Sequence, residues 1–461
     1  MDRSSIDRFG SAQTAAQCPR HLETTSSFDV SLSKKRQKAR EESAESPFQS
    51  AFSAGSRLSR PWFLIGFLAV IHTAFAFSCA KVSSVTHDEY WHLPVGLLHW
   101  RTARFDFDRL NPPLIRLWAA LPLLATDAQV DPAPADLLGY GDMFLQRNGK
   151  TYRRLFLLAR GMIVVLSVLT GLVLARWAEQ WFGGKAACLA ALLWFADPNV
   201  LAHGSLVTTD VGAAFFFVLT LYLLWRWARE RKRRQAIAFG VWLGLAQLAK
   251  YTCVLLVPVS IVLWFAWRPR QRPADAGRAA ADGAARSLVG QWGLALALSL
   301  VVINAGYLFR GSGTPLRQYR FQSQMLRGLA DRMGWLADVP VPLPADYLLG
   351  LDAQRHVMEG KHPVFLDGQW RTDGFRSYYV KTLIYKLPHS VHWLLLVSLV
   401  LLLDRGDPDR RRRFSSLWLL LPFGLLVALA SFSRMQLGLR YVLPVLPLLY
   451  LVVAQCGQRA D

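Results

Sequence analysis

The sequence predicts an all-α integral membrane protein, folded as a bundle of about ten membrane spans. Hydrophobic residues make up 52% of the 461 residues. They are grouped in apolar runs of roughly 20 residues with few charges, which are long enough to cross a bilayer as helices. The net charge of +21 falls in short Arg-rich segments between these runs. That distribution is typical of the cytoplasmic loops of membrane proteins, and no basic polar domain suited to nucleic acid is visible.

The chain divides into a tail and a membrane domain. Residues 1–60 are rich in Ser, Ala, Arg and Lys, so we expect a disordered cytoplasmic tail there. Residues 61–461 form the membrane domain. Its spans are expected near 61–80, 155–178, 186–203, 211–227, 236–249, 250–267, 288–309, 389–403, 415–432 and 439–455.

Two longer segments, 81–154 and 310–388, are expected to be external loops. Within the first loop, residues 90–100 and 114–125 are aromatic and apolar, but they are too short to cross a bilayer. We therefore expect helices that lie in the membrane interface.

Orientation follows from the short loops. The loops near 228–235, 268–287 and 404–413 carry the Arg runs, and all three are cytoplasmic if the N-terminus is inside. The protein is then a multi-pass protein of the plasma (inner) membrane. The charged positions 88, 89, 210 and 250 share its external, periplasmic face.

An acidic pair, Asp88-Glu89, follows the first span directly. Carboxylates beside lipid are costly, so they mark chemistry more often than packing. Asp88 could take a proton from an attacking hydroxyl, with Glu89 beside it as a second catalytic carboxylate. The alternative is that the pair caps the following helix or pairs with a nearby Arg.

Four cations are candidates for binding a phosphate at this face: Arg116, Lys250, Arg376 and Arg440. Guanidinium and ammonium groups bind phosphate oxygens through charge-assisted hydrogen bonds. For Arg116 and Lys250 the alternative is snorkelling, in which the side chain only reaches from the bilayer to its surface.

Four polar residues are expected to support the site: Asn111, His203, Asp210 and Tyr441. Asn111 precedes two prolines, and Tyr441 lies at the outer start of the last span. Asp210 stands at the outer start of the fourth span, where it could equally be a helix N-cap. His203 could equally be a core or interfacial histidine.

Carboxylates and cations on one face of a membrane bundle suit attack on a lipid phosphodiester. The carboxylate would activate an acceptor hydroxyl, and the cations would stabilise the departing lipid phosphate. The five cysteines are scattered and show no metal-site spacing. We expect no tightly bound cofactor and no metal-ligand motif, and the sequence leaves metal dependence open.

At these residues the chain resembles the bacterial polyprenyl-phosphate-dependent glycosyltransferases of the protein O-mannosyltransferase type (family 39, GT-C fold). The resemblance runs from about Pro61 to Val453. It rests on the order and spacing of His87-Asp88-Glu89, Asn111-Pro112-Pro113-Leu114, Asp197-Pro198-Asn199, Ala202-His203-Gly204, Val207-Thr208-Thr209-Asp210, Leu248-Ala249-Lys250-Tyr251-Thr252, Pro344-Ala345-Asp346-Tyr347-Leu348-Leu349-Gly350, Tyr378-Tyr379, Lys386-Leu387-Pro388 and Leu437-Gly438-Leu439-Arg440-Tyr441-Val442-Leu443-Pro444.

The resemblance implies a GT-C-type bundle with a catalytic Asp88, with Glu89 beside it, and an outward-facing site fed by a polyprenyl-phosphate sugar. The implied reaction is inverting transfer of a mannose-like sugar to a hydroxyl of a protein or lipid acceptor. Family members often have His where Asn111 stands and Arg where Ser205 stands. They also often continue past the tenth span, whereas this chain ends at Asp461.

Two alternatives stay open at this point. Within the same class, the chain could be an aminoarabinose-type transferase that acts on a lipid acceptor. In a different class, it could be a polytopic transporter or lipid flippase. A flippase needs a polar path through the bilayer, yet the middles of the second, fourth, sixth and eighth spans carry almost no ionisable groups.

Overall fold

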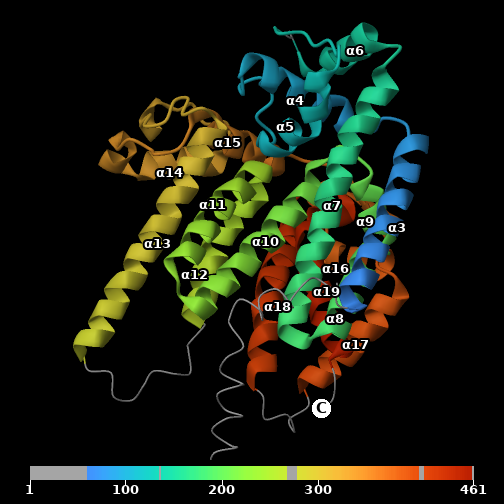
Figure 1. The fold of residues 1–461 in the computed structure, drawn as a ribbon. Helices are drawn as coiled ribbons and strands as arrows, with labels where there is room; N and C mark the ends of the chain where they lie inside the picture. The colour runs from blue at the N-terminus through green and yellow to red at the C-terminus, as the bar shows by residue number, and fades with distance from the viewer. Residues whose placement is uncertain (1–59, 134–135, 267–277, 404–409, 459–461) are drawn as a thin grey trace, which may run out of the picture. The chain divides into compact units, whose positions relative to one another are not determined.

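A computed structural model describes residues 60–133, 136–266, 278–403 and 410–458. The expected tail, and parts of the Arg-rich segments 268–287 and 404–413, lie outside the described residues. From Arg60 onward the chain packs as one unit. In this unit, long helices form a bundle, and a layer of short helices lies over one end of it (Figure 1).

Each expected span coincides with a helix or with neighbouring helices. In chain order these are α3 (Arg60–Val82), α7 (Tyr152–Phe182), α8 (Gly184–Phe195) with α9 (Pro198–Gly204), α10 (Thr209–Glu230), α11 (Arg233–Ala249), η2 (Tyr251–Leu255) with α12 (Leu256–Ala266), α13 (Arg278–Gly306), α17 (His389–Leu403), α18 (Arg410–Ser431), and η5 (Gly438–Tyr441) with η6 (Leu443–Val445), α19 (Leu446–Ala454) and η7 (Gln455–Gly457).

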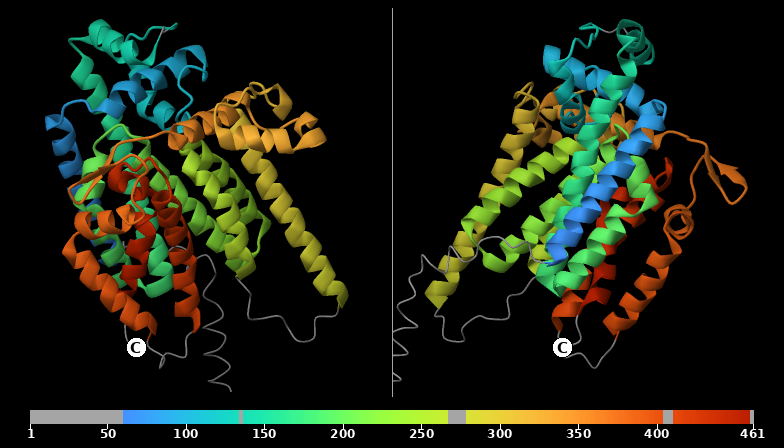
Figure 2. Two further views of the ribbon diagram at one scale, coloured as in Figure 1. Left: turned by 180° about the vertical axis from the view of Figure 1, so that it is seen from behind. Right: turned by 45° about the vertical axis from the view of Figure 1, so that its right-hand side comes forward.

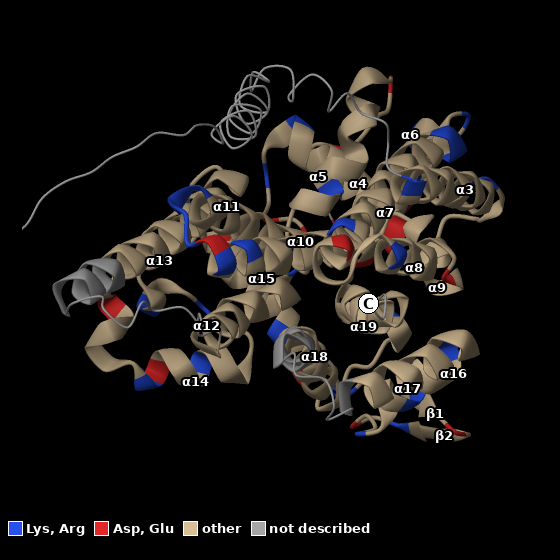
Figure 3. Ribbon diagram, turned by 60° about the horizontal axis from the view of Figure 1, so that its bottom comes forward, with Lys and Arg blue, Asp and Glu red and all other residues tan. Residues whose placement is uncertain are grey.

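Not all of these helices are long enough to cross a membrane alone. By length and composition, four qualify: α3, α7, α10 and the part Ser287–Gly306 of α13. Two bent pairs, α8 with α9 and α16 (Tyr378–Lys386) with α17, raise the number to six. Other apolar helices run for 10–17 residues. Most of the helical ribbon is free of charged residues (Figure 3). The helical membrane bundle is thus confirmed, and the number ten stays a prediction.

The first external loop folds into α4 (His87–Thr102), α5 (Leu114–Ala120), η1 (Leu121–Ala125) and α6 (Leu137–Asn148). The two short helices expected within it are therefore present. The second loop contributes η3 (Leu316–Gln318), α14 (Gln324–Arg332), η4 (Gly334–Asp338) and α15 (Ala345–Glu359) to the same end of the bundle. It also forms an antiparallel hairpin of β1 (Val364–Leu366) and β2 (Gln369–Arg371) that stands out from the helices (Figure 2).

The third span is broken at Asp197-Pro198, where α8 and α9 meet at 60°. Pro198 has no N–H to continue α8, and its fixed φ suits the first turn of α9. Asp197 caps α9 by accepting from the backbone N–H groups of Asn199 at 2.6 Å and Val200 at 3.1 Å. Its other oxygen accepts from the Tyr450 hydroxyl in α19. The bend is therefore tied to the last helix.

Helices α11 and α13 approach closely at two glycines one turn apart. A Cβ at Gly240 would lie 2.4 Å from the carbonyl oxygen of Ala295, and one at Gly244 would lie 2.7 Å from Cβ of Val302. Small residues at this spacing let two helices pack backbone to backbone in a membrane. A separate apolar cluster then joins these helices to the external layer: Phe105, Leu248, Tyr251, Ile303, Tyr307 and Tyr347.

We predict that Gly240→Ala destabilises the protein. The added methyl group meets the α13 backbone, which cannot move aside as a flexible side chain would, and overpacking of this kind costs about 1–3 kcal/mol. Thermal unfolding of the purified protein in detergent measures the effect. Gly290→Ala on α13 is the matched control, because a Cβ there meets nothing within 4 Å. Equal unfolding temperatures for the two variants would contradict close packing of α11 on α13.

Candidate active site

Helix α4 begins at a capping box formed by Thr86 and Glu89. The Glu89 carboxylate accepts from the backbone N–H of Thr86 at 3.0 Å and from its hydroxyl at 3.1 Å. Asp88 consequently falls in the first turn of α4. Its side chain is 25% exposed and pairs with Nη2 of Arg440. Asp88 is thus a carboxylate that is held in place and still open to a substrate.

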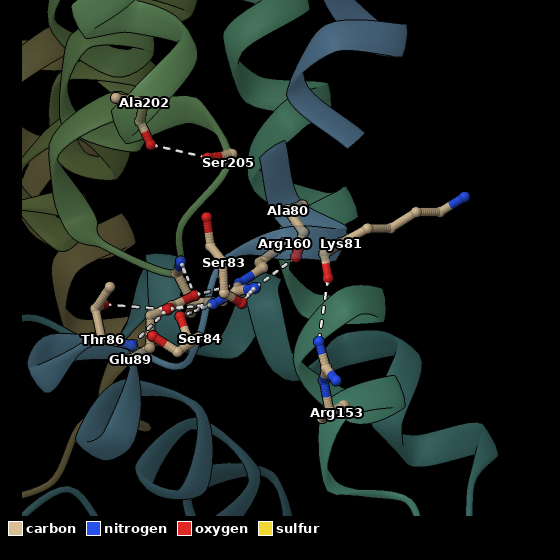
Figure 4. A network of polar contacts seen from close by, with 11 residues as sticks. Ala80, Lys81, Ser83, Ser84, Thr86, Glu89, Arg153, Arg160, Ala202 and Ser205 are labelled. Carbon is tan, nitrogen blue, oxygen red and sulfur yellow. Dashed lines mark hydrogen bonds and ion pairs between the residues drawn. The ribbon is translucent and has the colours of Figure 1, made fainter. Parts of the chain in front are cut away.

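Glu89 points the other way and is fully buried. Arg160 of α7 holds it through two bonds of 2.7 Å, from Nε to Oε1 and from Nη2 to Oε2 (Figure 4). The backbone N–H of Val207 donates to Oε1 at 2.9 Å. With the two bonds from Thr86, the carboxylate accepts five hydrogen bonds. This geometry supports a structural role for Glu89 and leaves no free acceptor position for the second catalytic carboxylate that the sequence suggested.

The other donors of Arg160 hold the end of the first span. Nη1 donates to the carbonyl of Ala80 at 2.6 Å and to that of Ser83 at 3.0 Å, and Nη2 donates to that of Ser84 at 2.8 Å. One buried guanidinium therefore satisfies one carbonyl group of the last turn of α3 and two of the turn that leads into α4 (Figure 4).

Asp210, Lys250, Arg440 and Asp88 form one ionic cluster. Asp210 is buried in the first turn of α10. It pairs with Nζ of Lys250 through one oxygen and accepts from Nε of Arg440 at 3.0 Å through the other. Because Arg440 also pairs with Asp88, one guanidinium joins two carboxylates from different helices. The structure brings together these four residues, which the sequence had placed on one face.

Three expected supporting residues lie at different distances from the ionic cluster. The ring centroid of Tyr441 lies 5.6 Å from Nζ of Lys250, within the range of a cation–π contact. His203 in α9 is half-buried and lies close enough to interact electrostatically with the cluster. Asn111 is half-buried, and no hydrogen bond ties it to any residue in the described part of the chain.

The phosphate contact predicted for Arg116 stays a prediction, and in the structure this side chain already has several partners. This side chain is 1% exposed. Its Nε donates to Nδ1 of His92 at 2.9 Å, its Nη1 donates to the carbonyl of Asp108 at 3.0 Å, and its Nη2 pairs with the Asp108 carboxylate. A phosphate would have to displace these partners. Arg116 instead connects α5 to α4 and to the segment between these two helices.

Burial and the charge of Arg116 shift the pKa values of the groups around it. Burial, and then the charge of Arg116, lower the pKa of His92 to about 3 and that of His99 to about 4. Burial is the largest influence on Asp108 and opposes its ionisation, but the charge of Arg116 and the hydrogen bonds from Leu110 and Arg116 together outweigh it, so the pKa of this carboxyl lies below its ordinary value. At neutral pH both histidines are therefore neutral, which lets Nδ1 of His92 accept from Arg116.

Arg376 also lies outside the ionic cluster. It is exposed, and its guanidinium carbon lies 4.1 Å from the centroid of the Phe432 ring. Its segment is nevertheless close to η5, because the Tyr378 hydroxyl accepts from the backbone N–H of Gly438 at 3.1 Å. The geometry therefore gives the predicted phosphate contact of Arg376 no support.

Two structural contacts of the site were not expected from the sequence. Arg160 lies inside an apolar run, and a lone ionisable residue in a span is itself a sign of a buried partner. Arg109 donates from Nε to Asp346 at 2.7 Å and so joins the two external loops. No local pattern marks that second pair, since its members are separated by 237 positions.

The ionic cluster offers two kinds of chemistry. Asp88 is a partly exposed carboxylate that can accept a proton, and Lys250 with Arg440 can stabilise developing negative charge on a phosphate. Among the described residues, no group of three or more His, Cys, Asp or Glu side chains could hold a metal ion.

A family model supports the resemblance over part of the chain. Residues 156–281 match the model of dolichyl-phosphate-mannose-protein mannosyltransferase. This segment carries His203, Asp210 and Lys250. No curated protein matches the sequence.

Solved structures of other proteins resemble this one to different degrees. The structure of ArnT from Cupriavidus metallidurans bound to undecaprenyl phosphate matches with a TM-score of 0.50 and 14% identity, over 85% of this chain and 59% of that one. AglB from Archaeoglobus fulgidus, an archaeal oligosaccharyltransferase in complex with an inhibitory peptide and a dolichol-phosphate, gives 0.49 and 13%, over 85% and 50%. The Pmt1-Pmt2 protein O-mannosyltransferase of S. cerevisiae bound to the sugar donor gives 0.42 and 17%, over 55% and 34%.

The chain thus spans less than two thirds of the length of these structures. The first match, at 14% identity, shows that the chain has a GT-C-type helical membrane fold. The predicted fold class is thereby confirmed, and the family-model match confirms the predicted resemblance over residues 156–281.

We predict that Glu89→Gln destabilises the protein, because it leaves the charge of Arg160 buried without a counter-ion. Breaking a buried pair in this way costs about 3–5 kcal/mol. Thermal unfolding in detergent measures the loss. Glu230→Gln is the control, since its partners are partly exposed cations and such pairs contribute at most about 1 kcal/mol. If both variants unfolded at the wild-type temperature, the structural role of Glu89 would be refuted.

Proposed function

We propose that the protein is a polyprenyl-phosphate-dependent hexosyltransferase that moves a mannose-like sugar to an acceptor hydroxyl with inversion. The observation that carries the proposal is the bridge of Arg440 between Asp88 and Asp210, with Lys250 on the second carboxylate. This arrangement sets a proton acceptor beside two cations at one end of the bundle. The GT-C fold and the family-model match over 156–281 support the broader class of membrane glycosyltransferases, to which this reaction belongs.

In the proposed reaction Asp88 is the general base. The acceptor hydroxyl oxygen attacks the anomeric carbon of the donor sugar, and its proton passes to the Asp88 carboxylate. The bond from the anomeric carbon to the phosphate oxygen breaks, and the phosphate leaves with the electron pair. A single displacement of this kind inverts the anomeric centre. Asp210 is less suited to be the base, because it is buried and both its oxygens are paired.

Lys250 and Arg440 bind the donor phosphate in this proposal. The donor is a phosphodiester with one negative charge, and the released polyprenyl phosphate carries a second charge. Cations fixed in advance beside the phosphate stabilise that added charge as it develops. Arg440 is paired with Asp88 before the donor arrives. A phosphate that draws Arg440 toward itself would weaken this pair and make Asp88 a better proton acceptor.

We place the site on the external face of the plasma (inner) membrane, with the N-terminus in the cytoplasm. The support for this orientation is the run of Arg residues in the short loops, which resist translocation. The description of the matching family model favours a protein hydroxyl as acceptor. The transfer assay described below distinguishes it from a lipid acceptor when both are supplied.

We predict that Asp88→Asn abolishes transfer while the protein still folds. The amide keeps the shape of the side chain but cannot accept the proton, and a lost general base costs roughly two to four orders of magnitude in rate. The assay follows transfer from polyprenyl-phosphate mannose to a Ser/Thr-rich peptide or to lipid extract.

Asp127→Asn is the matched control for that experiment. Asp127 lies in the same external loop and is exposed, so its replacement should leave the rate unchanged. Donor binding and the unfolding temperature of Asp88→Asn should stay near wild type, because Asp88 is partly exposed and Arg440 keeps its contact with Asp210. Near-normal transfer by Asp88→Asn would rule out Asp88 as the base.

We predict that Lys250→Ala raises the KM for the polyprenyl-phosphate donor about tenfold, the cost of one hydrogen bond to a charged group. Arg440→Ala should act in the same direction. Lys361→Ala is the control, because Lys361 is an exposed cation of the second external loop. Steady-state kinetics over a range of donor concentrations measure the change. Wild-type KM values in both Lys250→Ala and Arg440→Ala would show that these cations do not contact the donor.

A further inference from the structure

A cavity lies beside Arg160, at the start of α7. Its volume is about 500 Å³, and it lies between the C-terminal end of α3, the turn 83–85 and the first two turns of α7. None of the four members of the ionic cluster lines it. The cavity is thus separate from the site assigned above, although Arg160 forms part of its wall.

The cavity is strongly positive. Its lining includes Lys81, Arg153, Arg154 and Arg160, and no Asp or Glu. Arg160 is neutralised by Glu89. The side chains of Lys81, Arg153 and Arg154 form no ion pair with any residue in the described ranges, and Arg153 donates only to the carbonyl of Lys81 at 3.3 Å (Figure 4). The lining therefore includes three cations that have no counter-ion among the described residues.

Two further features favour an anion in this cavity. The first turn of α7, Tyr152 to Arg154, lines it, and the backbone N–H groups at the start of a 31-residue helix carry partial positive charge. Ser83 and Ser84 also line it, and their hydroxyl groups can donate to phosphate oxygens.

The position of the cavity indicates a lipid. Its lining includes the last residues of α3, one of the helices that is long and apolar enough to cross a membrane. Along its length α3 exposes large apolar side chains: Phe63 at 74%, Val70 at 68%, Phe75 at 60% and Val82 at 78%. Apolar surface of this extent on a membrane helix faces acyl chains. A lipid whose chains lie along α3 would bring its headgroup to the level of Lys81.

We propose that this cavity binds the phosphate group of an anionic membrane lipid, held by Lys81, Arg153 and Arg154. The bound headgroup would offset part of the charge of these three cations and rest against the wall that contains Arg160. This assignment does not depend on the transfer reaction, because it uses none of the residues of the ionic cluster.

The test uses the full-length protein in detergent, with phosphatidylglycerol, phosphatidylcholine or inorganic phosphate added at equal concentration. Phosphatidylglycerol should raise the unfolding temperature, and the other two should not. In the double variant Lys81→Gln/Arg154→Gln the affinity for phosphatidylglycerol, from titration of the shift, should fall about 25-fold, since each basic residue near a membrane surface contributes a factor of about five.

Lys361→Gln/Arg332→Gln is the matched control. It removes the same charge from two exposed residues in the second external loop and should bind phosphatidylglycerol as wild type does. Equal losses of affinity for phosphatidylglycerol in both double variants would show a general attraction to anionic lipid, and the proposed site would be wrong. An unchanged affinity in Lys81→Gln/Arg154→Gln would overturn it as well. If inorganic phosphate stabilised the protein as much as phosphatidylglycerol does, the ligand would be free phosphate, and the assignment of a lipid would be wrong.

Discussion

The ion pair between Glu89 and Arg160 is the interaction on which the candidate site depends. A buried pair is stable only where further hydrogen bonds satisfy both ions, and here they come from three segments. The end of α3 and the following turn supply carbonyl groups to Arg160, and Val207 supplies an N–H to Glu89. The pair therefore fixes where α4 starts relative to α7 and to the segment before α10. Asp88 is the residue before Glu89. The direction of the Asp88 side chain is therefore set by the pair of Glu89 with Arg160, in which Asp88 takes no part.

The ionic cluster has a different physical character. Its two carboxylates and two cations balance in charge, so the residues can be brought together at the end of the bundle without a ligand. This arrangement keeps the cations oriented in advance, which is the condition for electrostatic stabilisation of a transition state. It also means that an incoming phosphate must compete with carboxylates for Arg440. Under the proposed function, that competition links donor binding to the basicity of Asp88.

Much of the fold could be predicted from the sequence, because apolar runs and short Arg-rich loops report directly on membrane insertion. The same rule placed Asp88, Asp210 and Lys250 on one face, and the structure brings them together. Side-chain partners could not be predicted in this way. The pairing of Arg116 could not be predicted, because its partners reach it only when the chain folds back between α4 and α5. Arg160 was hidden within an apolar run, although a lone charge there could have been read as a sign of a buried partner.

The connection between α9 and α10 has one more consequence. It consists of residues 205–208 only, and its Val207 N–H is committed to Glu89. At its start, the Ser205 hydroxyl donates back to the carbonyl of Ala202 at 2.9 Å. Connections at protein surfaces ordinarily tolerate added residues. This one is short, and hydrogen bonds hold it at both Ser205 and Val207. Its length is therefore fixed more strictly than its composition: an inserted residue would move the N–H away from Glu89 and rotate the start of α10. Sequences that keep this architecture should vary here by substitution and not by insertion or deletion.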